Sequence, residues 1–159
     1  MDSSTKIIVV LVFICGLLAG VVLTGVLSPQ TVHPGKTVIY SKKAPEPIGP
    51  YSQAVRYGNV VHLSGQIGID PVTGTLSGTT GGQTTQAMEN LHSVLNESGL
   101  GFEDVIQTRI YLVNMSDWTT VNGIYGSYFT TSYPARSTVQ VAGLPKGAAV
   151  EIEMVAKER

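Results

Sequence analysis

The sequence contains a single cysteine, Cys15, among 159 residues. One cysteine cannot form an intrachain disulfide, so the fold must depend on its hydrophobic core. Neither a C-x-x-C pair nor an H-E-x-x-H motif occurs, and the three histidines have no partner at ligand spacing. The sequence therefore predicts no metal site. It also lacks the G-x-G-x-x-G and Walker loops that bind nucleotide phosphates.

Charge of either sign is scarce. The chain has 10 Lys and Arg against 11 Asp and Glu, and charged residues make up only 13% of it, about half the usual share in a soluble protein. No basic excess exists to attract nucleic acid through its phosphates, so nucleic acid is not an expected partner. Because mean hydropathy is positive, at +0.19, part of the chain must be more apolar than a solvated surface.

The apolar excess is concentrated between Ile7 and Leu27, a run of 21 residues without a charge. As a helix this run would be roughly 31 Å long, which matches a bilayer core. A cleaved secretory signal has a shorter apolar region, and here Pro29 would follow the best cleavage site directly. We therefore predict a single-pass membrane anchor in residues 1–28. Secretion after signal cleavage is the alternative.

Residues 29–43 are expected to form a tether and a first strand at 37–40, and residues 44–159 a single domain. Apolar spacing predicts a helix over 83–98, ended by Gly99. It also predicts a second helix, capped by Ser116 or Asp117 and ending before Pro134, in which Val121, Ile124, Tyr125 and Tyr128 share one face. Further strands are expected at 54–57, 60–63, 105–113, 137–141 and 149–156. This order predicts an α+β fold, with both helices on one face of a mixed sheet. Exposed Val and Ile on the other face would favour self-association.

The segment around Arg136 is the strongest candidate for a functional site. Arg136 follows Pro134 at the entry to a predicted strand, where its planar fork can bind a carboxylate through two hydrogen bonds. Glu151 and Glu153 alternate with apolar residues on the last strand, so either could orient Arg136 or transfer protons. A plain salt bridge between Arg136 and one of these glutamates is the alternative.

Two other segments could line a site. Tyr51 follows three prolines and a glycine within 45–50, which would fix the direction of its side chain; a rigid entry to a strand needs the same residues. Gly65, between Ser64 and Gln66, interrupts a strand pattern and predicts a β-bulge or a close approach to the backbone. Packing alone would also account for that glycine.

Four segments resemble the RidA/YjgF family, the reactive-intermediate enamine/imine deaminases. They are IGPYSQA at 48–54, LSGQIGIDPVTG at 63–74, TVNGIYGSYF at 120–129 and PARSTVQVAGLPKGAAVEIEMVA at 134–156. They occur in the family's order between residue 44 and the C-terminus. The resemblance implies a chorismate-mutase-like homotrimer with its active sites in clefts between subunits.

The resemblance also implies an activity: hydrolysis of small 2-iminoacids, of the 2-iminobutanoate and 2-iminopropanoate type, to 2-ketoacids and ammonia. The carbon of an iminium group is already electrophilic, so positioning the substrate and delivering a water suffice, and no cofactor is expected. By motif, Arg136 would bind the substrate carboxylate and Glu151 would activate the water. Tyr51 would line the cleft, Asn122 would help close it, and the backbone at Ser64 and Gly65 would add hydrogen bonds.

Two alternatives to this activity come with the same family. A non-catalytic trimer that binds a small molecule or a partner would keep the fold; the presence of both Tyr51 and Glu151 favours the enzyme. An endoribonuclease or translation inhibitor is disfavoured because no cluster of Lys and Arg occurs in the domain. Thr138 stands where some relatives have cysteine, so control of the site through a thiol is not expected.

Overall fold

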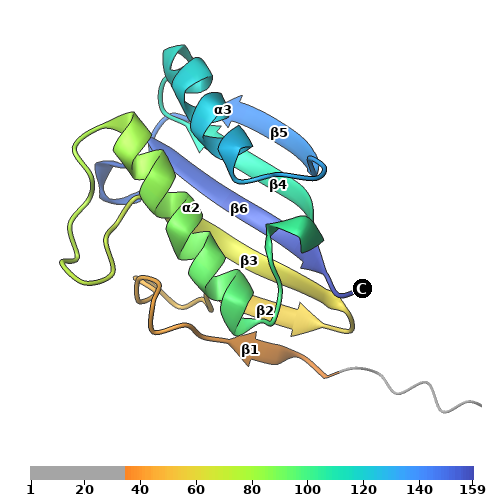
Figure 1. Cartoon of the computed structure of the whole chain (residues 1–159). Coiled ribbons are helices and arrows are strands. Elements are labelled where there is room, and N and C mark those ends of the chain that lie inside the picture. Colours follow the sequence, from red (N-terminus) through yellow and green to blue (C-terminus); the bar gives the residue numbers. More distant parts are fainter. Residues whose placement is uncertain (1–34) are drawn as a thin grey trace, which may run out of the picture. The chain divides into compact units, whose positions relative to one another are not determined.

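A six-stranded mixed sheet carries both helices on one face (Figure 1). The computed structural model describes residues 35–159. The strands are β1 (Thr37–Ile39), β2 (Ala54–Tyr57), β3 (Val60–Ile67), β4 (Val105–Leu112), β5 (Ala135–Gln140) and β6 (Val150–Lys157). Their order across the sheet is β1-β2-β3-β6-β4-β5. β4 and β5 pair in parallel, and the other neighbours are antiparallel. The predicted α+β sheet is thus confirmed.

The two helices are α2 (Thr80–Glu97) and α3 (Trp118–Ser127). α2 begins three residues before the predicted start because Thr79 caps it: the Thr79 hydroxyl accepts the Gly82 N–H at 3.1 Å. It ends where expected, and Gly99 takes the left-handed conformation with φ of 74°. Short 3₁₀ turns occupy Phe102–Asp104, Met115–Asp117 and Pro145–Gly147. The second of these turns leads directly into α3.

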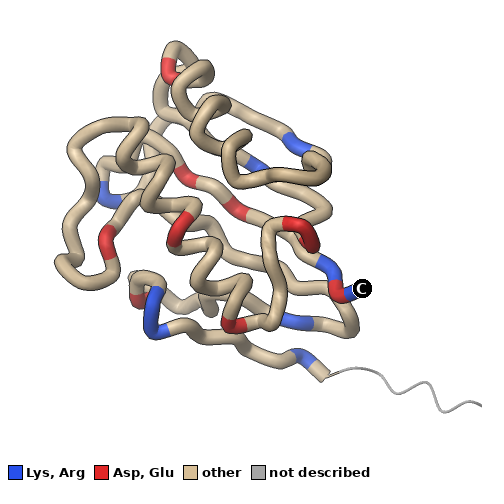
Figure 2. The backbone as a smooth tube through the Cα atoms, in the orientation of Figure 1, with Lys and Arg blue, Asp and Glu red and all other residues tan. Residues whose placement is uncertain are grey.

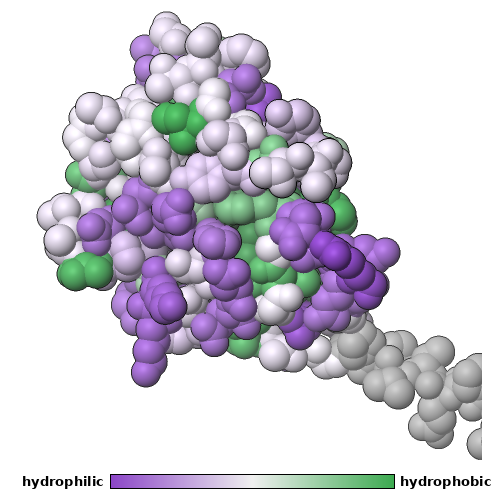
Figure 3. Space-filling model, in the orientation of Figure 1, coloured by the Kyte–Doolittle hydropathy of each residue, from purple (hydrophilic) through white to green (hydrophobic). Residues whose placement is uncertain are grey.

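The core lies between the sheet and the helices. Val150, Ile152 and Met154 of β6 are at most 1% exposed, and Met88 and Leu91 of α2 are fully buried. Burial of each such side chain stabilises the fold by about 1.5–3 kcal/mol. Because side chains alternate along a strand, β6 turns Glu151 and Glu153 to the opposite face, as the sequence predicts. The helix-covered side is largely hydrophilic on its surface, with limited hydrophobic areas (Figure 3).

The face of the sheet without helices is more polar than predicted. Val139 is exposed there, as expected for an uncovered apolar position. By strand register, however, Tyr111 lies between Val139 and Glu151 on this face, and Arg109 lies beside Glu153. Charged residues therefore interrupt the apolar surface that the sequence pattern suggests.

The prediction of an N-terminal transmembrane helix is corrected. Within residues 35–159 no helix is long and apolar enough to cross a membrane, and the run from Ile7 to Leu27 lies outside the described residues. An apolar run reflects only the preference of a segment for an apolar medium; it does not establish a helix or a membrane. The anchor, the membrane as a partner and the single-pass location are therefore withdrawn.

Candidate active site

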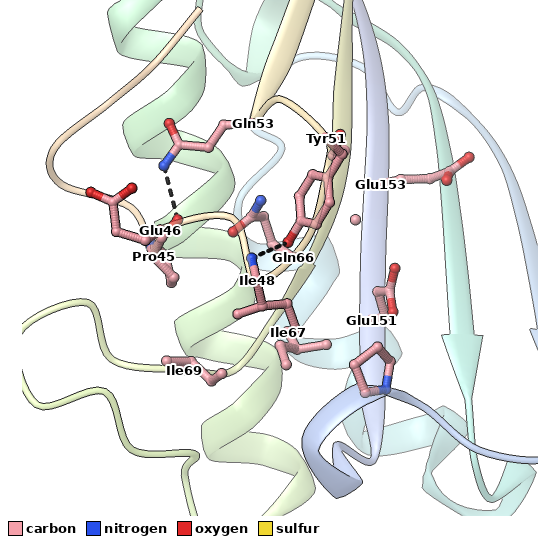
Figure 4. A pocket seen from close by; sticks show the side chains of 13 residues that line it. Pro45, Glu46, Ile48, Tyr51, Gln53, Gln66, Ile67, Ile69, Glu151 and Glu153 are labelled. Atoms are coloured by element: carbon pink, nitrogen blue, oxygen red, sulfur yellow. Dashed lines mark hydrogen bonds between the residues drawn. The ribbon is translucent and has the colours of Figure 1, made fainter.

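A cavity of about 320 Å³ lies between β3, β6 and the segment 45–53 (Figure 4). Three carboxylates line it, those of Glu46, Glu151 and Glu153, and neither Lys nor Arg is among its lining residues. Its apolar wall includes Ile48 and Pro145. We name this space the Glu151 cavity. Its surplus of negative groups suits proton transfer but does not favour a free carboxylate ligand.

Gly65 makes room for the Glu151 side chain. A Cβ atom at Gly65 would lie 2.7 Å from the Glu151 carboxyl carbon, closer than any real contact. The pairing of β3 with β6 shifts register between Leu63 and Gln66, which confirms the predicted irregularity at this glycine. Burial, and then the charge of Glu153, raise the pKa of the Glu151 carboxyl. This half-buried carboxyl is therefore suited to exchange protons nearer neutral pH.

Tyr51 and Ser64 connect the segment 45–53 to the cavity. The Tyr51 hydroxyl accepts the Ile48 N–H at 3.3 Å, so the ring folds back against the segment that carries it. The Ser64 hydroxyl donates to the Ser52 carbonyl at 2.7 Å, and the Ser64 N–H donates to the Gln53 carbonyl at 2.9 Å. Both residues line the Glu151 cavity. The donors of Ser64 are used to fix the loop, so in this arrangement the serine holds the wall in place.

Arg136 lies in a second pocket, at the edge of the sheet beside α3. We name it the Arg136 pocket. Arg136 Nη2 donates to Asn122 Oδ1 at 2.8 Å, and its Cζ lies 4.8 Å from the centroid of the Tyr125 ring. The Tyr125 hydroxyl in turn donates to Thr108 at 3.2 Å. No Asp or Glu lines this pocket. The guanidinium is thus held by neutral groups and keeps its charge for an anion.

Within one chain the structure does not bring Arg136 and Glu151 together. Arg136 pairs with Thr108 across the β4–β5 ladder, whereas Glu151 pairs with Tyr111 across the β4–β6 ladder. Thr108 and Tyr111 are an odd number of residues apart on one strand, so they point to opposite faces. The simple salt bridge from Arg136 to Glu151 or Glu153 is therefore wrong for a single chain. The ion-pair partner of Glu153 is Arg109, at 2.6 Å.

Three features of the site were missed from the sequence. They are the Arg109–Glu153 pair, the Tyr125 ring under Arg136, and Glu46 in the cavity. Tyr125 was assigned only to the buried face of its helix, but its spacing of three from Asn122 places both on one side of α3 and could have suggested the role. Arg109 could not be found this way because its partner lies on a strand distant in sequence.

The distribution of other charges limits what else the domain can bind. In Figure 2 the Lys and Arg positions are spread over the domain, with acidic positions among them. Among residues 35–159, no group of three or more His, Cys, Asp and Glu could hold a metal ion. Outside the two pockets, the ion pairs among the described residues join Arg56 to Glu158 and Arg159 to Glu103 and Asp104.

The family model described as Endoribonuclease L-PSP matches residues 41–158. The chain belongs to the RidA/YjgF family. This confirms the family that the four motifs indicate. A human RidA/YjgF relative, 2-iminobutanoate/2-iminopropanoate deaminase, is 46% identical over 122 residues, which cover 76% of this chain and 89% of the relative. The chloroplastic Reactive Intermediate Deaminase A of Arabidopsis thaliana is 45% identical, with 76% of this chain and 65% of the relative covered.

The RidA/YjgF fold is also seen in similar solved structures. E. coli TdcF, solved with bound serine, has a TM-score of 0.76 and 36% identity, and the match covers 77% of this chain and 99% of TdcF. The residues that the family model matches, 41–158, include β2 to β6, both helices and the linings of both pockets.

Proposed function

We propose that the domain is an enamine/imine deaminase that hydrolyses small 2-iminoacids to 2-ketoacids and ammonia. The relatives named 2-iminobutanoate/2-iminopropanoate deaminase and Reactive Intermediate Deaminase A support this activity. The observation that carries the proposal is the division of charge between the two pockets: one offers a carboxylate with a raised pKa, and the other a guanidinium free of carboxylate partners.

The active site is composite. A 2-iminoacid has a carboxylate directly attached to the reacting carbon. The protein's cation, which binds the carboxylate, and its base, which activates the water, must therefore both contact the same small substrate. Arg136 and Glu151 of one chain lie on opposite faces of the sheet and cannot meet this requirement. Arg136 of one subunit facing Glu151 of another in a cyclic homotrimer would meet it. Self-association thus supplies the missing half of each site.

The reaction then needs few steps. Arg136 binds the substrate carboxylate through its fork and so fixes the iminium carbon opposite the Glu151 carboxylate. Glu151 takes a proton from a water as the water oxygen bonds to that carbon, which gives a carbinolamine. Glu151 returns this proton to the nitrogen and then takes the hydroxyl proton as the carbonyl forms and the C–N bond breaks; that proton passes to the departing ammonia. The products are the 2-ketoacid and ammonium, and the carboxylate of Glu151 is regenerated.

The apolar wall of the Glu151 cavity sets the size of the substrate side chain. Ile48, Ile69 and Pro145 line the space next to Glu151. A methyl or ethyl group would contact this wall and leave the iminium carbon facing Glu151. Such contacts are worth roughly 0.8 kcal/mol for each buried methylene. We therefore expect 2-iminobutanoate to be preferred modestly over 2-iminopropanoate.

The decisive experiment measures ammonia and 2-ketoacid release from enzymatically generated 2-iminobutanoate. Glu151→Gln and Arg136→Gln should each lower kcat/KM about 100-fold or more. The matched controls Glu97→Gln and Arg159→Gln remove the same charges from exposed positions far from both pockets, and should keep wild-type activity. The proposal fails if the wild-type protein gives no acceleration over spontaneous hydrolysis, or if either site variant keeps full activity while folded.

A further inference from the structure

An ion pair lies next to the proposed base. Arg109 Nη1 contacts Glu153 Oε1 at 2.6 Å, across the β4–β6 ladder in which these two residues are direct partners. Glu153 lines the Glu151 cavity, and its side chain lies close to that of Glu151 on the same strand (Figure 4). The proposed mechanism gives neither Arg109 nor Glu153 a role. Their position beside the reacting carboxylate calls for an explanation.

The two glutamates are close enough to influence one another. They are two residues apart on β6, so their Cα atoms are roughly 7 Å apart and both side chains leave the same face. Two carboxylates at this distance in a partly buried cavity disfavour each other's ionisation. A base that must accept a proton from water has to be ionised first. Without a cation beside it, the charge of Glu153 would therefore disfavour the ionised form of Glu151 that the reaction needs.

Arg109 is the cation placed to compensate that charge. Three elements bring ionisable groups near Glu151. β6 itself contributes Glu153, and β4 contributes Tyr111 and, two residues away, Arg109. The segment 45–53 contributes Glu46 and Tyr51. β3 contributes only uncharged residues to the cavity, and the Pro145–Gly147 turn contributes Pro145, while Lys146 of that turn lines an adjoining pocket beside Glu46. Among the described residues, Arg109 is the cation that forms an ion pair with a glutamate of the cavity, and that glutamate is Glu153 rather than Glu151.

We propose that Arg109 is a positioning residue for the deaminase site: it holds Glu153 in an ion pair and so leaves Glu151 as the ionised, unpaired carboxylate of the cavity. This inference rests on the proposed function and adds a residue that keeps the base of that site ionised. Burial and the charge of Glu153 raise the pKa of Glu151, and Arg109 offsets the second cause. Loss of Arg109 would remove the offset, so Glu151 would hold its proton to higher pH.

The test is the pH dependence of kcat/KM in the full chain. Arg109→Gln should move the acidic limb of the profile upward by about half to one pH unit and leave the plateau at higher pH unchanged. Glu153→Gln and the double variant Arg109→Gln/Glu153→Gln should have their acidic limb at or below the wild-type position. Arg159→Gln, which breaks an exposed pair with Asp104, should leave the profile unmoved.

A purely structural role for Arg109 predicts a different pattern. Arg109→Gln would then lower the plateau without moving the limb, and the double variant would be no better than the single one; either result overturns the proposal. A ¹³C NMR titration of the Glu151 carboxyl, assigned with Glu151→Gln, separates the two hypotheses. An upward shift in Arg109→Gln supports the role of Arg109 even if the protein has no turnover, and an unmoved titration rejects that role even if deamination is established.

Discussion

The Glu151 cavity and the Arg136 pocket lie on opposite faces of one sheet and differ in the sign of their charge. The first is lined by three carboxylates and no cation, the second by one guanidinium and no carboxylate. A ligand that carries both an anionic end and a carbon open to attack by water needs both kinds of group. Each pocket by itself offers half of them. The comparison explains why this fold would gain its activity through assembly.

The two pockets also differ in how their central side chain is held. Arg136 is held by contacts, a hydrogen bond to Asn122 and the face of Tyr125. Glu151 is held mainly by shape, because Gly65 leaves open the space that the carboxylate occupies. Neutral contacts preserve the charge of a cation, and the absence of donors leaves a carboxylate free to bind a proton. Each arrangement suits the role proposed for the residue.

Mixing the two inactive variants is the most direct test of whether the two pockets of different subunits form one site. Coexpressed Glu151→Gln and Arg136→Gln chains would form mixed trimers, and one of the three sites in each mixed trimer would combine an intact arginine with an intact glutamate. Random assembly should restore about a quarter of the wild-type activity, far above either variant alone. The measurement is ammonia release by copurified chains with two different tags. Failure to recover any activity would place both residues in one chain's site, against the composite arrangement.

Substitution of Gly65 by alanine tests the shape of the Glu151 cavity. The new methyl group would occupy the position of the Glu151 carboxylate, so the side chain must move by an ångström or more. A displacement of that size costs about 10-fold or more in kcat. Gly143→Ala is the matched control, since a Cβ there meets nothing within 4 Å. Crystal structures and kinetics of both variants would show whether activity follows the displacement; an active Gly65→Ala with a displaced Glu151 would contradict the assigned role.

Loss of the Asn122 amide tests how the Arg136 pocket holds its cation. Asn122→Ala removes the acceptor at 2.8 Å from Arg136 Nη2, and hydrogen bonds to charged groups contribute about 1.5–3 kcal/mol. We expect KM for 2-iminobutanoate to rise ~10-fold with a smaller change in kcat, because the carboxylate is bound before the reaction and during it. Asn96→Ala, on the exposed side of α2, is the control. A fall in kcat at constant KM would instead assign Asn122 to the chemical step.

Local patterns in the sequence account for much of this comparison. Apolar spacing predicts α2, alternation predicts that Glu151 and Glu153 share a face of β6, and Gly65 within a strand predicts the irregularity that the register shift shows. Each of these signals depends on residues near one another in the chain. Such signals identify Glu151 and Gly65 in one pocket, but they miss Glu46 there and the Tyr125 ring in the other.

The separation of the pockets could not be predicted because it depends on pairing between distant strands. Whether Arg136 and Glu151 share a face is decided by how β5 and β6 align with β4, and a slip of one residue would reverse the answer. The same pairing places Arg109 against Glu153, 44 residues away. The transmembrane prediction is wrong for another reason: the hydropathy of an isolated run indicates a preference for an apolar medium but does not establish a membrane-spanning helix.

The smallest expected effect concerns stability and follows from the raised pKa of Glu151. Burial first, and Glu153 second, lift this pKa above its ordinary value of 4.5, so the folded state binds the proton more tightly than the unfolded state does. The free energy of unfolding therefore falls as pH rises from about 4.5 to the raised value, and the loss is complete above it. Glu151→Gln carries no such penalty. Its Tm minus that of the wild type should therefore increase over this range.

Thermal unfolding of the two proteins at a series of pH values tests this, because the other titrating groups are common to both and cancel in the difference. Glu97→Gln, at an exposed position of α2, should give a difference that does not change with pH. A Tm difference for Glu151→Gln that shrinks as pH rises would mean that the ionised Glu151 is stabilised by a cation in the assembled protein. Arg136 of a neighbouring subunit would then be the first candidate for that cation, which a Glu151 titration repeated in Arg136→Gln would decide.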